Sequence, residues 1–344
     1  MPAVSVIMSV YNGEAYLDAS IRSILSQTFT DFEFIIVDDG SVDNTLKIIT
    51  RHAENDRRIV LSSRENKGLI ASLNEAAELS SGDFLARMDA DDIAFPDRFE
   101  QQIEAFERNG NCIALGTFAN EINADGKDIG KILSGPVGSG EIRRAVQDGQ
   151  PLVIHPTLMM KRSSFCTIGG YREHFKHAED KDLLYRLVEL GEVDNLPVPL
   201  LQYRVHGKNI SVVHGNYQEM LGALISEMHS IRANEGKDIS AYMTSAPDLS
   251  SLDEQFSRKG LRASVIMRMM NPYYVGSAWA SDPEPLEIIM EGLAMMDNSG
   301  DRSMIAKALD LKIRIIKSLI KQGYIARFLR FSIKMFPRAA RLNA

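Results

Sequence analysis

Few residues in this sequence could build a disulfide framework or a cysteine-rich metal centre. Two cysteines, Cys112 and Cys166, occur in 344 residues, which is too few for either arrangement, so we expect free thiols. The sequence also lacks an apolar run of the roughly 18 to 20 residues needed to cross a bilayer. Its first residues contain no basic segment and no small-residue cleavage site, so we interpret them as a β-strand and not as a signal peptide. With 44% hydrophobic and 25% charged residues, the composition is that of a globular protein.

Two common nucleotide-binding motifs are missing as well. The chain contains no GxxxxGK[ST] sequence, and Gly138-Ser139-Gly140 is followed by Glu-Ile-Arg, which does not complete GxGxxG. Any bound diphosphate must therefore be held by a metal ion and by scattered basic side chains. The candidates are Arg64, Lys67 and Arg87, although each of them has a simpler interpretation as a surface charge.

Acidic residues outnumber basic ones over most of the chain, whereas basic residues predominate at its C-terminal end. Residues 305–344 contain ten basic residues and one acid, a net charge of +9, which leaves −16 for the rest of a chain whose net charge is −7. Within this tail, apolar residues from Ile325 to Phe336 follow helical spacing, and the basic residues lie off that stripe. Such a helix either docks on the protein's own body or lies on an anionic membrane surface, and we favour the membrane.

Short apolar runs alternate with amphipathic stretches in the first hundred residues. This order predicts an α/β fold with a doubly wound, mostly parallel sheet. We expect strands at residues 4–10, 32–37, 59–61 and 84–88 and helices at residues 14–27, 43–54, 69–79 and 97–108. Later strands are expected near residues 113–118, 157–161 and 200–205, and a helix at 181–190. The predicted organisation is one domain over residues 1–215, a helical extension over 216–300 and a basic amphipathic tail over 301–344.

Acidic residues gather where two of the predicted strands end. Asp38 and Asp39 follow the second strand, and the segment RMDADDIAFPDR, which begins at Arg87, follows the fourth. Because ligands bind outside the carboxyl ends of parallel strands, both groups are expected at one edge, together with residues after the first strand. Carboxylate oxygens beside a phosphorylated ligand are the donors that Mg²⁺ and Mn²⁺ prefer. We therefore predict a divalent-cation site at Asp89 and Asp91, with Asp92 as a helper, while Asp97 is expected only to begin a helix.

Longer segments of the chain resemble the family-2 glycosyltransferases, which have the GT-A fold. They span about residues 4–211 and leave the C-terminal third uncovered. The segments are, in order, VSVIMSVYNG, SILSQT, FIIVDDGSVD, NKGL, MDADDIAFPDR, HPTLMMKR, IGGY, AEDKDLLYRL and YRVHGKNIS. In many members a Trp follows the E-D-x-D-L segment, where this chain has Leu184; the departure concerns the acceptor side.

The resemblance implies a metal-dependent inverting enzyme with a Rossmann-like GT-A domain and a helical C-terminal extension. Its donor would be a nucleotide-sugar, most often UDP-linked, and its acceptor a saccharide or lipid-linked saccharide used in cell-surface polysaccharide or lipopolysaccharide synthesis. It also implies Mn²⁺ or Mg²⁺ as cofactor and no nucleic-acid partner. The location expected from the resemblance and the tail is cytoplasmic, at the inner face of the cell membrane.

The resemblance also implies roles for individual residues, to which the two candidate arginines are added. The expected donor-binding residues are Ser9, Tyr11, Asp38, Asp39, Arg64, Arg87 and Asp89, and the expected metal ligands are Asp89, Asp91 and His206. Asp180 is the expected catalytic base, since a carboxylate must remove the proton of the attacking hydroxyl. Judged by its position alone, Asp180 is an acid favoured at a helix N-terminus.

On the acceptor side we place His155 and Tyr171, with Asp182 as a second candidate for the base. A hydrogen-bonded structural histidine is the simpler interpretation of His155. Two other classes of protein stay open at this point. One is a phosphate-handling α/β protein, although its nucleophilic Asp would follow the first strand and not the fourth. The other is a non-catalytic protein that binds nucleotide-sugars, against which the presence of both Asp91 and Asp180 argues.

Overall fold

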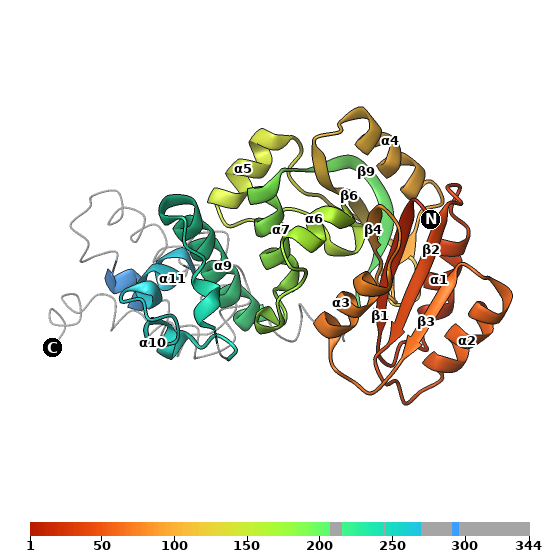
Figure 1. Cartoon of the computed structure of the whole chain (residues 1–344), viewed down its shortest axis with the longest axis horizontal. Coiled ribbons are helices and arrows are strands. Elements are labelled where there is room, and N and C mark those ends of the chain that lie inside the picture. The colour runs from red at the N-terminus through yellow and green to blue at the C-terminus, as the bar shows by residue number, and fades with distance from the viewer. Residues whose placement is uncertain (207–214, 244, 270–290, 296–344) are drawn as a thin grey trace, which may run out of the picture. The chain divides into compact units, whose positions relative to one another are not determined.

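The computed structural model describes residues 1–206, 215–243, 245–269 and 291–295. The chain divides into two compact units, Met1–Val212 and Val213–Ala344 (Figure 1). Across the described part of the chain, no helix is both long enough and apolar enough to cross a membrane. The predicted tail at 301–344, and with it the predicted membrane contact, lies outside the described residues.

The first unit is built on one mixed β-sheet. Among the described residues the strand order is β3-β2-β1-β4-β8-β6-β9-β5, and β7 pairs with β6 outside this path. The strands are β1 (Val4–Val10), β2 (Phe32–Asp38), β3 (Ile59–Ser63), β4 (Phe84–Arg87), β5 (Ile93–Ala94), β6 (Cys112–Ile122), β7 (Asp128–Leu133), β8 (Met159–Lys161) and β9 (Glu192–Arg204).

The first four strands form the predicted parallel block. β1 pairs in parallel with β2 on one side and β4 on the other, and β2 pairs in parallel with β3. Helices α1 (Leu17–Leu25) and α2 (Thr45–Asn55) contact each other on one side of this block, and α3 (Leu69–Leu79) packs on β1 and β2 from the other side (Figure 1). Because both faces are covered, β1 and β2 are apolar and buried over nearly their whole length.

The strand order reverses between β1 and β4, since β2 and β3 lie to one side of β1 and β4 lies to the other. In a doubly wound sheet the loops separate at such a point and leave a crevice outside the carboxyl ends of the strands. The loops after β1, β2, β3 and β4 therefore meet at this edge, and they carry most of the predicted site residues.

The second half of the sheet is mixed, which sequence patterns did not predict. β8 is antiparallel to both β4 and β6, β5 is antiparallel to β9, and β6 is parallel to β9. β9 begins at Glu192, well before the predicted start at residue 200. Its final residues pair with β5, so the end of β9 lies beside the turn that follows β4.

Among the described residues of the first unit, four further helices follow: α4 (Arg98–Arg108), α5 (Ser139–Gln147), α6 (Arg162–Thr167) and α7 (Glu179–Leu190). Asp97 is the N-cap residue of α4, so the predicted helix start is confirmed. Short 3-10 helices, η1 (His155–Thr157) and η2 (Glu173–Phe175), precede β8 and α7. They bring the chain back to the carboxyl edge of β4, where the backbone N–H of Arg87 donates to the Leu158 carbonyl at 2.8 Å.

The described part of the second unit is helical. Helix α9 (Gly215–Glu235) packs on α11 (Leu261–Met269) through buried residues that include Leu224 and Val265. Arg268 and Glu227 form an ion pair of 2.5 Å between these helices. The remaining elements are η3 (Ile239–Tyr242), η4 (Leu249–Ser251) and α10 (Leu252–Gln255).

Candidate functional site

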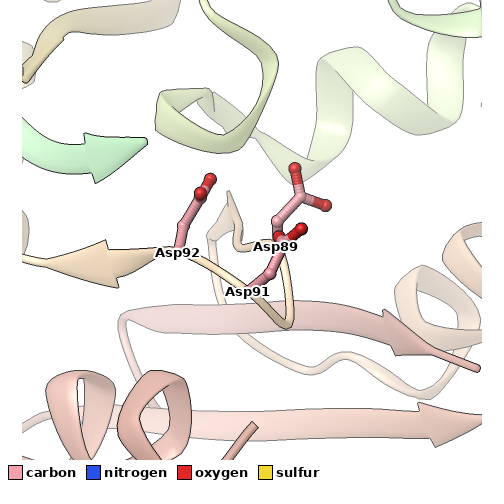
Figure 2. A group of neighbouring side chains, drawn as sticks. All are labelled: Asp89, Asp91 and Asp92. Atoms are coloured by element: carbon pink, nitrogen blue, oxygen red, sulfur yellow. The ribbon is translucent and has the colours of Figure 1, made fainter. Parts of the chain in front are cut away.

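Three carboxylates occupy the turn between β4 and β5. Oxygen atoms of Asp89, Asp91 and Asp92 all lie within 4.8 Å of one another, and Figure 2 shows the three side chains projecting to one side of the turn. Two neighbouring elements hold the turn in place. Ser20 on α1 donates its hydroxyl hydrogen to the Asp89 carbonyl at 2.8 Å, and the Arg98 guanidinium on α4 donates to the Arg87 carbonyl at 2.9 Å.

Asp92 is the buried member of this acidic cluster, with 1% of the residue exposed. Its Oδ1 atom accepts a hydrogen bond from the Arg204 backbone N–H at 2.8 Å, whereas Oδ2 has no partner among the described residues. Burial raises the pKa of Asp92 well above its usual value, and the charges of Asp89 and Asp91 raise it further. Burial also raises the pKa of Asp89, although the Arg87 guanidinium opposes that shift.

A bound divalent cation would relieve both features of the acidic cluster. It would give the unsatisfied Asp92 oxygen a partner and neutralise the repulsion among the three carboxylates. An all-oxygen donor set of this kind suits Mg²⁺ or Mn²⁺. The residues present therefore fit a divalent metal, and Asp89, Asp91 and Asp92 are the groups that would hold it.

His206 lies next to this cluster, as predicted, although it comes from the far end of the first unit's sequence. Its Nε2 atom is 2.9 Å from Oδ2 of Asp91. The imidazole ring stacks on Tyr16, with ring centroids 5.3 Å apart and the ring planes at 20°. A nitrogen donor at this position is within reach of a cation bound by Asp91.

Arg87 is a buried positive charge beside the acidic cluster. The residue is 2% exposed and forms an ion pair with Asp89, and its Nε atom has no partner in the part of the chain that the structure describes. Close to it, Nε2 of His155 and the hydroxyl of Tyr171 are 2.8 Å apart. Burial and the Arg87 charge hold the pKa of His155 well below its usual value, so its imidazole is neutral. The hydrogen bond between His155 and Tyr171 occupies Nε2 of the one and the hydroxyl of the other. A role of either residue toward an acceptor stays a prediction.

The N-terminus of α7 carries two more acids, Glu179 and Asp180. Burial raises the pKa of Asp180, and burial together with the neighbouring Asp180 charge raises the pKa of Glu179 to about 7. Oδ1 of Asp180 accepts a hydrogen bond from the Lys181 backbone N–H at 2.7 Å. The charge of Asp180 also raises the pKa of Asp89, so the two acids are close enough to interact. The expected base therefore interacts electrostatically with one of the expected metal ligands.

Asp182 is placed differently from our prediction. The residue is 1% exposed, and its Oδ2 atom accepts hydrogen bonds from both Nε and Nη2 of Arg186, at 2.9 and 2.6 Å. Arg186 in turn donates to the Ile168 and Gly170 carbonyls at 2.8 Å. This buried ion pair fixes the turn before Tyr171, so Asp182 is a structural residue and not a second base. Its sequence position, two residues after Asp180 on a helix, turns it away from the crevice.

A cavity of about 350 Å³ opens between the first turn of α3 and the segment that joins η2 to α7. Leu69, Ile70 and Ala71 of α3 give it an apolar wall, and Lys176 and Glu179 belong to its opposite side. A cavity of this size, mostly apolar with a few charged groups, is typical of small-ligand sites. It adjoins Asp180 through Glu179.

The predicted donor-binding residues after β1, β2 and β3 gather at the same edge of the sheet. Ser9 pairs with Val37 in the β1–β2 register, and Tyr11 is 53% exposed. Asp38 accepts a hydrogen bond from the Ser63 hydroxyl at 2.9 Å. These residues lie in or directly after the last residues of neighbouring parallel strands.

Asp39 is buried and holds the start of α3. Its two oxygens accept hydrogen bonds from the backbone N–H groups of Lys67, at 2.8 Å, and Gly68, at 2.9 Å, and it forms an ion pair with Arg64. Arg64 also pairs with Glu75 at 2.6 Å. Both oxygens of Asp39 therefore already have protein partners, and its contact with a donor base stays a prediction.

Sequence reasoning missed four residues of this site: Tyr16, Arg98, Glu179 and Arg204. Arg98 follows the Pro-Asp pair and was interpreted only as part of a helix start, yet it is fully buried against the acidic turn. Arg204 precedes His206 by two positions, and that spacing puts both side chains on one face of an extended chain. This spacing is the one signal in the sequence that could have identified Arg204.

Comparison of the sequence with known proteins gives one family. The sequence model described as "Glycosyl transferase family 2" matches residues 5–169. An uncharacterized glycosyltransferase of Haemophilus influenzae is 35% identical over 232 residues, which cover 63% of this chain and 70% of that protein. The O-antigen biosynthesis glycosyltransferase WbnJ of Escherichia coli is 35% identical over 210 residues, covering 60% of this chain and 81% of WbnJ.

Comparison of the structure gives the same fold. Residues 1–349 of S. aureus TarS, crystallised with UDP-GlcNAc, match with a TM-score of 0.60 at 16% identity, covering 98% of this chain and 92% of that one. The mannosyltransferase PcManGT of Pyrobaculum calidifontis, in complex with GDP-Man and Mn²⁺, matches with a TM-score of 0.52 at 16% identity, covering 99% of this chain and 87% of that one. At this level of identity these structures show the fold, and the predicted GT-A fold is confirmed.

Proposed function

Because the chain belongs to glycosyl transferase family 2, we propose that it transfers a sugar, with inversion, from a nucleotide-sugar to a saccharide acceptor. One observation carries this proposal. The carboxylates of Asp89, Asp91 and Asp92 form one cluster after β4, and the charge of Asp180 acts on this cluster, since it raises the pKa of Asp89. An inverting transfer needs a cation for the leaving group on one side and a base for the attacking hydroxyl on the other.

The donor is proposed to be a UDP-sugar. Tyr11, exposed after β1, offers a ring face to a nucleobase, and the Arg64 and Asp39 pair lies beside it at the ends of β2 and β3. Asp89 and Arg87, at the end of β4, are then left for the ribose and the donor sugar. TarS was crystallised with a UDP-sugar and PcManGT with a GDP-sugar, and the assignment of uridine to this chain is our inference.

The metal is proposed to be Mn²⁺ or Mg²⁺, held by the acidic cluster with His206 alongside. When bound, such a cation neutralises the negative charge that develops on a departing diphosphate. The chain's own contribution is to keep three carboxylates and the His206 ring facing one point. His206 adds a nitrogen donor next to Asp91, which favours Mn²⁺ over Mg²⁺.

Asp180 is proposed to take the proton of the attacking acceptor hydroxyl. Burial raises its pKa above that of an ordinary carboxylate, which makes it a stronger base than an exposed Asp. Its backbone neighbour Glu179 lines the adjoining cavity, whose apolar wall on α3 is suited to the flat face of a sugar ring. The acceptor is proposed to be a cell-surface saccharide, because the chain is similar to WbnJ, a glycosyltransferase of O-antigen biosynthesis. The basic tail is proposed to hold the enzyme at a membrane.

A screen of nucleotide-sugars tests this proposal directly. Thermal stability of the whole chain would be measured with UDP-, GDP- and ADP-sugars, with and without Mn²⁺, because a ligand that binds the folded state raises its apparent stability. We expect a UDP-sugar to raise the melting temperature only with Mn²⁺, and the same mixture to release UDP.

Two variants sharpen the screen. Asp91→Ala is expected to abolish both the Mn²⁺-dependent shift and the release of UDP. Asp97→Asn is the matched control, because Asp97 lies in the same acidic segment but accepts a hydrogen bond from Gln101 at the start of α4. Stabilisation of Asp91→Ala to the same extent as the unaltered chain would rule out the proposed metal site.

A further inference from the structure

We propose that Arg204 is a positioning residue of the metal site, which sets the His206 ring against Asp91. The inference rests on the proposed function, because it takes the acidic cluster to be the place where a divalent cation binds. Arg204 is the last residue of β9 and is 4% exposed. It ties together three segments that are distant in the sequence and that meet at this cluster.

The backbone and the side chain of Arg204 both contact the acidic turn. The backbone N–H donates to Oδ1 of Asp92 at 2.8 Å, and Nε donates to the Asp91 carbonyl at 2.7 Å. Arg204, at the end of β9, is therefore bonded to two successive residues of the turn, Asp91 and Asp92. The buried Asp92 owes one of its hydrogen bonds to this attachment, so it is also part of the positioning system.

The outer end of the guanidinium reaches the turn that follows β6. Nη1 of Arg204 donates to the carbonyls of Asn123 and Ala124, at 3.2 and 3.0 Å. One side chain thus satisfies three carbonyl groups in two different turns. Only a planar group with several fixed donors does this, and a lysine ammonium on a flexible stem does not.

Tyr16 completes the arrangement from the N-terminal side of α1. The Arg204 guanidinium lies over the Tyr16 ring, 4.6 Å from its centroid, and the His206 ring stacks on the same residue. The side chains of Arg204 and His206 therefore share one aromatic neighbour, Tyr16. The Tyr16 ring that sets the orientation of the His206 imidazole is therefore itself held by Arg204.

With these contacts of Arg204 and Tyr16 in place, Nε2 of His206 lies 2.9 Å from Oδ2 of Asp91. Ligands of a metal ion need to be held in place to within about half an ångström, and residues behind the ligands supply that precision. Loss of such a supporting residue commonly weakens metal binding about 10- to 100-fold. We expect an effect of this size from changes at Arg204.

The test measures Mn²⁺ binding to the whole chain by the electron paramagnetic resonance signal of free Mn²⁺, in parallel with UDP release from a UDP-sugar. Arg204→Lys should weaken Mn²⁺ binding about 10- to 100-fold, and excess Mn²⁺ should restore much of the lost activity. Tyr16→Leu should weaken binding in the same direction, whereas Tyr16→Phe should not. In a His206→Ala background, Arg204→Lys should weaken Mn²⁺ binding by a clearly smaller factor than in the unaltered chain, because the two residues act together.

Arg58→Lys is the matched control, since Arg58 also packs on an aromatic ring, Phe32, at 4.5 Å and donates to a carbonyl, that of Leu25, at the other end of the sheet. Mn²⁺ affinity of folded Arg204→Lys and Tyr16→Leu within twofold of the unaltered chain would overturn the proposed role of Arg204. Absence of Mn²⁺ binding by the unaltered chain would instead overturn the proposed metal site itself. Should Arg204→Lys not fold, Tyr16→Leu decides the question, measured both in the unaltered chain and in the His206→Ala background.

Discussion

Asp92 shows at the scale of one residue how the site opposes the stability of the fold. Its carboxylate is buried with one oxygen unsatisfied among the described residues, and two other carboxylates lie within 4.8 Å. A buried acid whose pKa is raised above its unfolded value stabilises the fold while it is protonated. That contribution is present below the unfolded pKa and is lost as the pH rises through the folded pKa. Ionised Asp92 should therefore lower the free energy of unfolding of the metal-free protein at neutral and alkaline pH.

We expect Asp92→Asn to stabilise the metal-free protein at pH 8. Asn keeps the oxygen that accepts from the Arg204 backbone N–H, and its amide can donate to Asp89 or Asp91 in place of repelling them. A gain of about 1 kcal/mol raises the melting temperature by about 2 to 4 °C in a domain of this size. The measurement is thermal unfolding in a chelator, at pH 5 and at pH 8. The gain should shrink at pH 5, and addition of Mn²⁺ should stabilise the variant less than the unaltered chain. An Asp92→Asn protein that melts lower at pH 8 would contradict this account.

At the scale of elements, the site depends on loops that approach one another closely at the ends of parallel strands. Gly40, after β2, has a backbone φ of +77°, and a Cβ atom there would lie 2.7 Å from the backbone nitrogen of Asn66, after β3. The glycine therefore lets the loop with Asp39 approach the loop that begins α3. The hydrogen bonds from Lys67 and Gly68 to Asp39 depend on this approach.

Gly40→Ala should consequently destabilise the first unit and weaken donor binding. Strain from a left-handed alanine and the clash with Asn66 together should cost about 1 to 3 kcal/mol. Urea unfolding measures the loss of stability. Nucleotide-sugar binding, measured at urea concentrations below the unfolding transition, gives the loss of donor affinity. Gly140→Ala is the control, since Gly140 is on α5 with open space around its Cβ position. Equal stability of the two variants would show that the loops do not need this approach.

The parallel block was predictable because its strands and helices are local in sequence. Alternating apolar runs gave β1 to β4 and α1 to α3, and the ends of β2 and β4 gave the acidic residues. The mixed half was not predictable from such patterns, because β8 and the early part of β9 take their partners from distant strands. The pairing of β9 with β5 is a contact of this kind, and it is what brings Arg204 and His206 to the acidic turn. Local patterns also failed to separate Asp180 from Asp182, which differ in burial and in ion pairing.

At the scale of the whole molecule, charge is distributed very unevenly along the chain. Residues 305–344 carry a net charge of +9, and the remainder carries −16. These residues lie outside the part of the chain that the structure describes, and the membrane contact is expected from their sequence. A basic amphipathic helix gains about 1 kcal/mol per basic residue near an anionic leaflet.

The full chain is therefore expected to bind anionic vesicles in a salt-dependent manner. Sedimentation with vesicles that contain phosphatidylglycerol, compared with vesicles of phosphatidylcholine, measures this binding at low and at physiological salt. A chain that ends at Met304 should lose it, while a chain with several of the tail's lysines and arginines changed to glutamine should lose most of it. Binding by the shortened chain as strong as that of the full chain would show that the membrane contact lies elsewhere or does not exist.

The catalytic base is central to the proposed transfer, and the pH dependence of turnover in Asp180→Asn tests the assignment of Asp180 most directly. Asn has nearly the same shape and keeps an acceptor for the Lys181 N–H, so the fold and the donor site should persist. With a saturating UDP-sugar and Mn²⁺, the unaltered enzyme should gain activity as the pH rises through the raised pKa of Asp180. The Asp180→Asn variant should bind the donor within twofold of the unaltered enzyme, turn over about 100- to 10,000-fold more slowly, and lose that rise with pH. An Asp180→Asn enzyme that turns over within tenfold of the unaltered one, with the same pH dependence, would contradict the account.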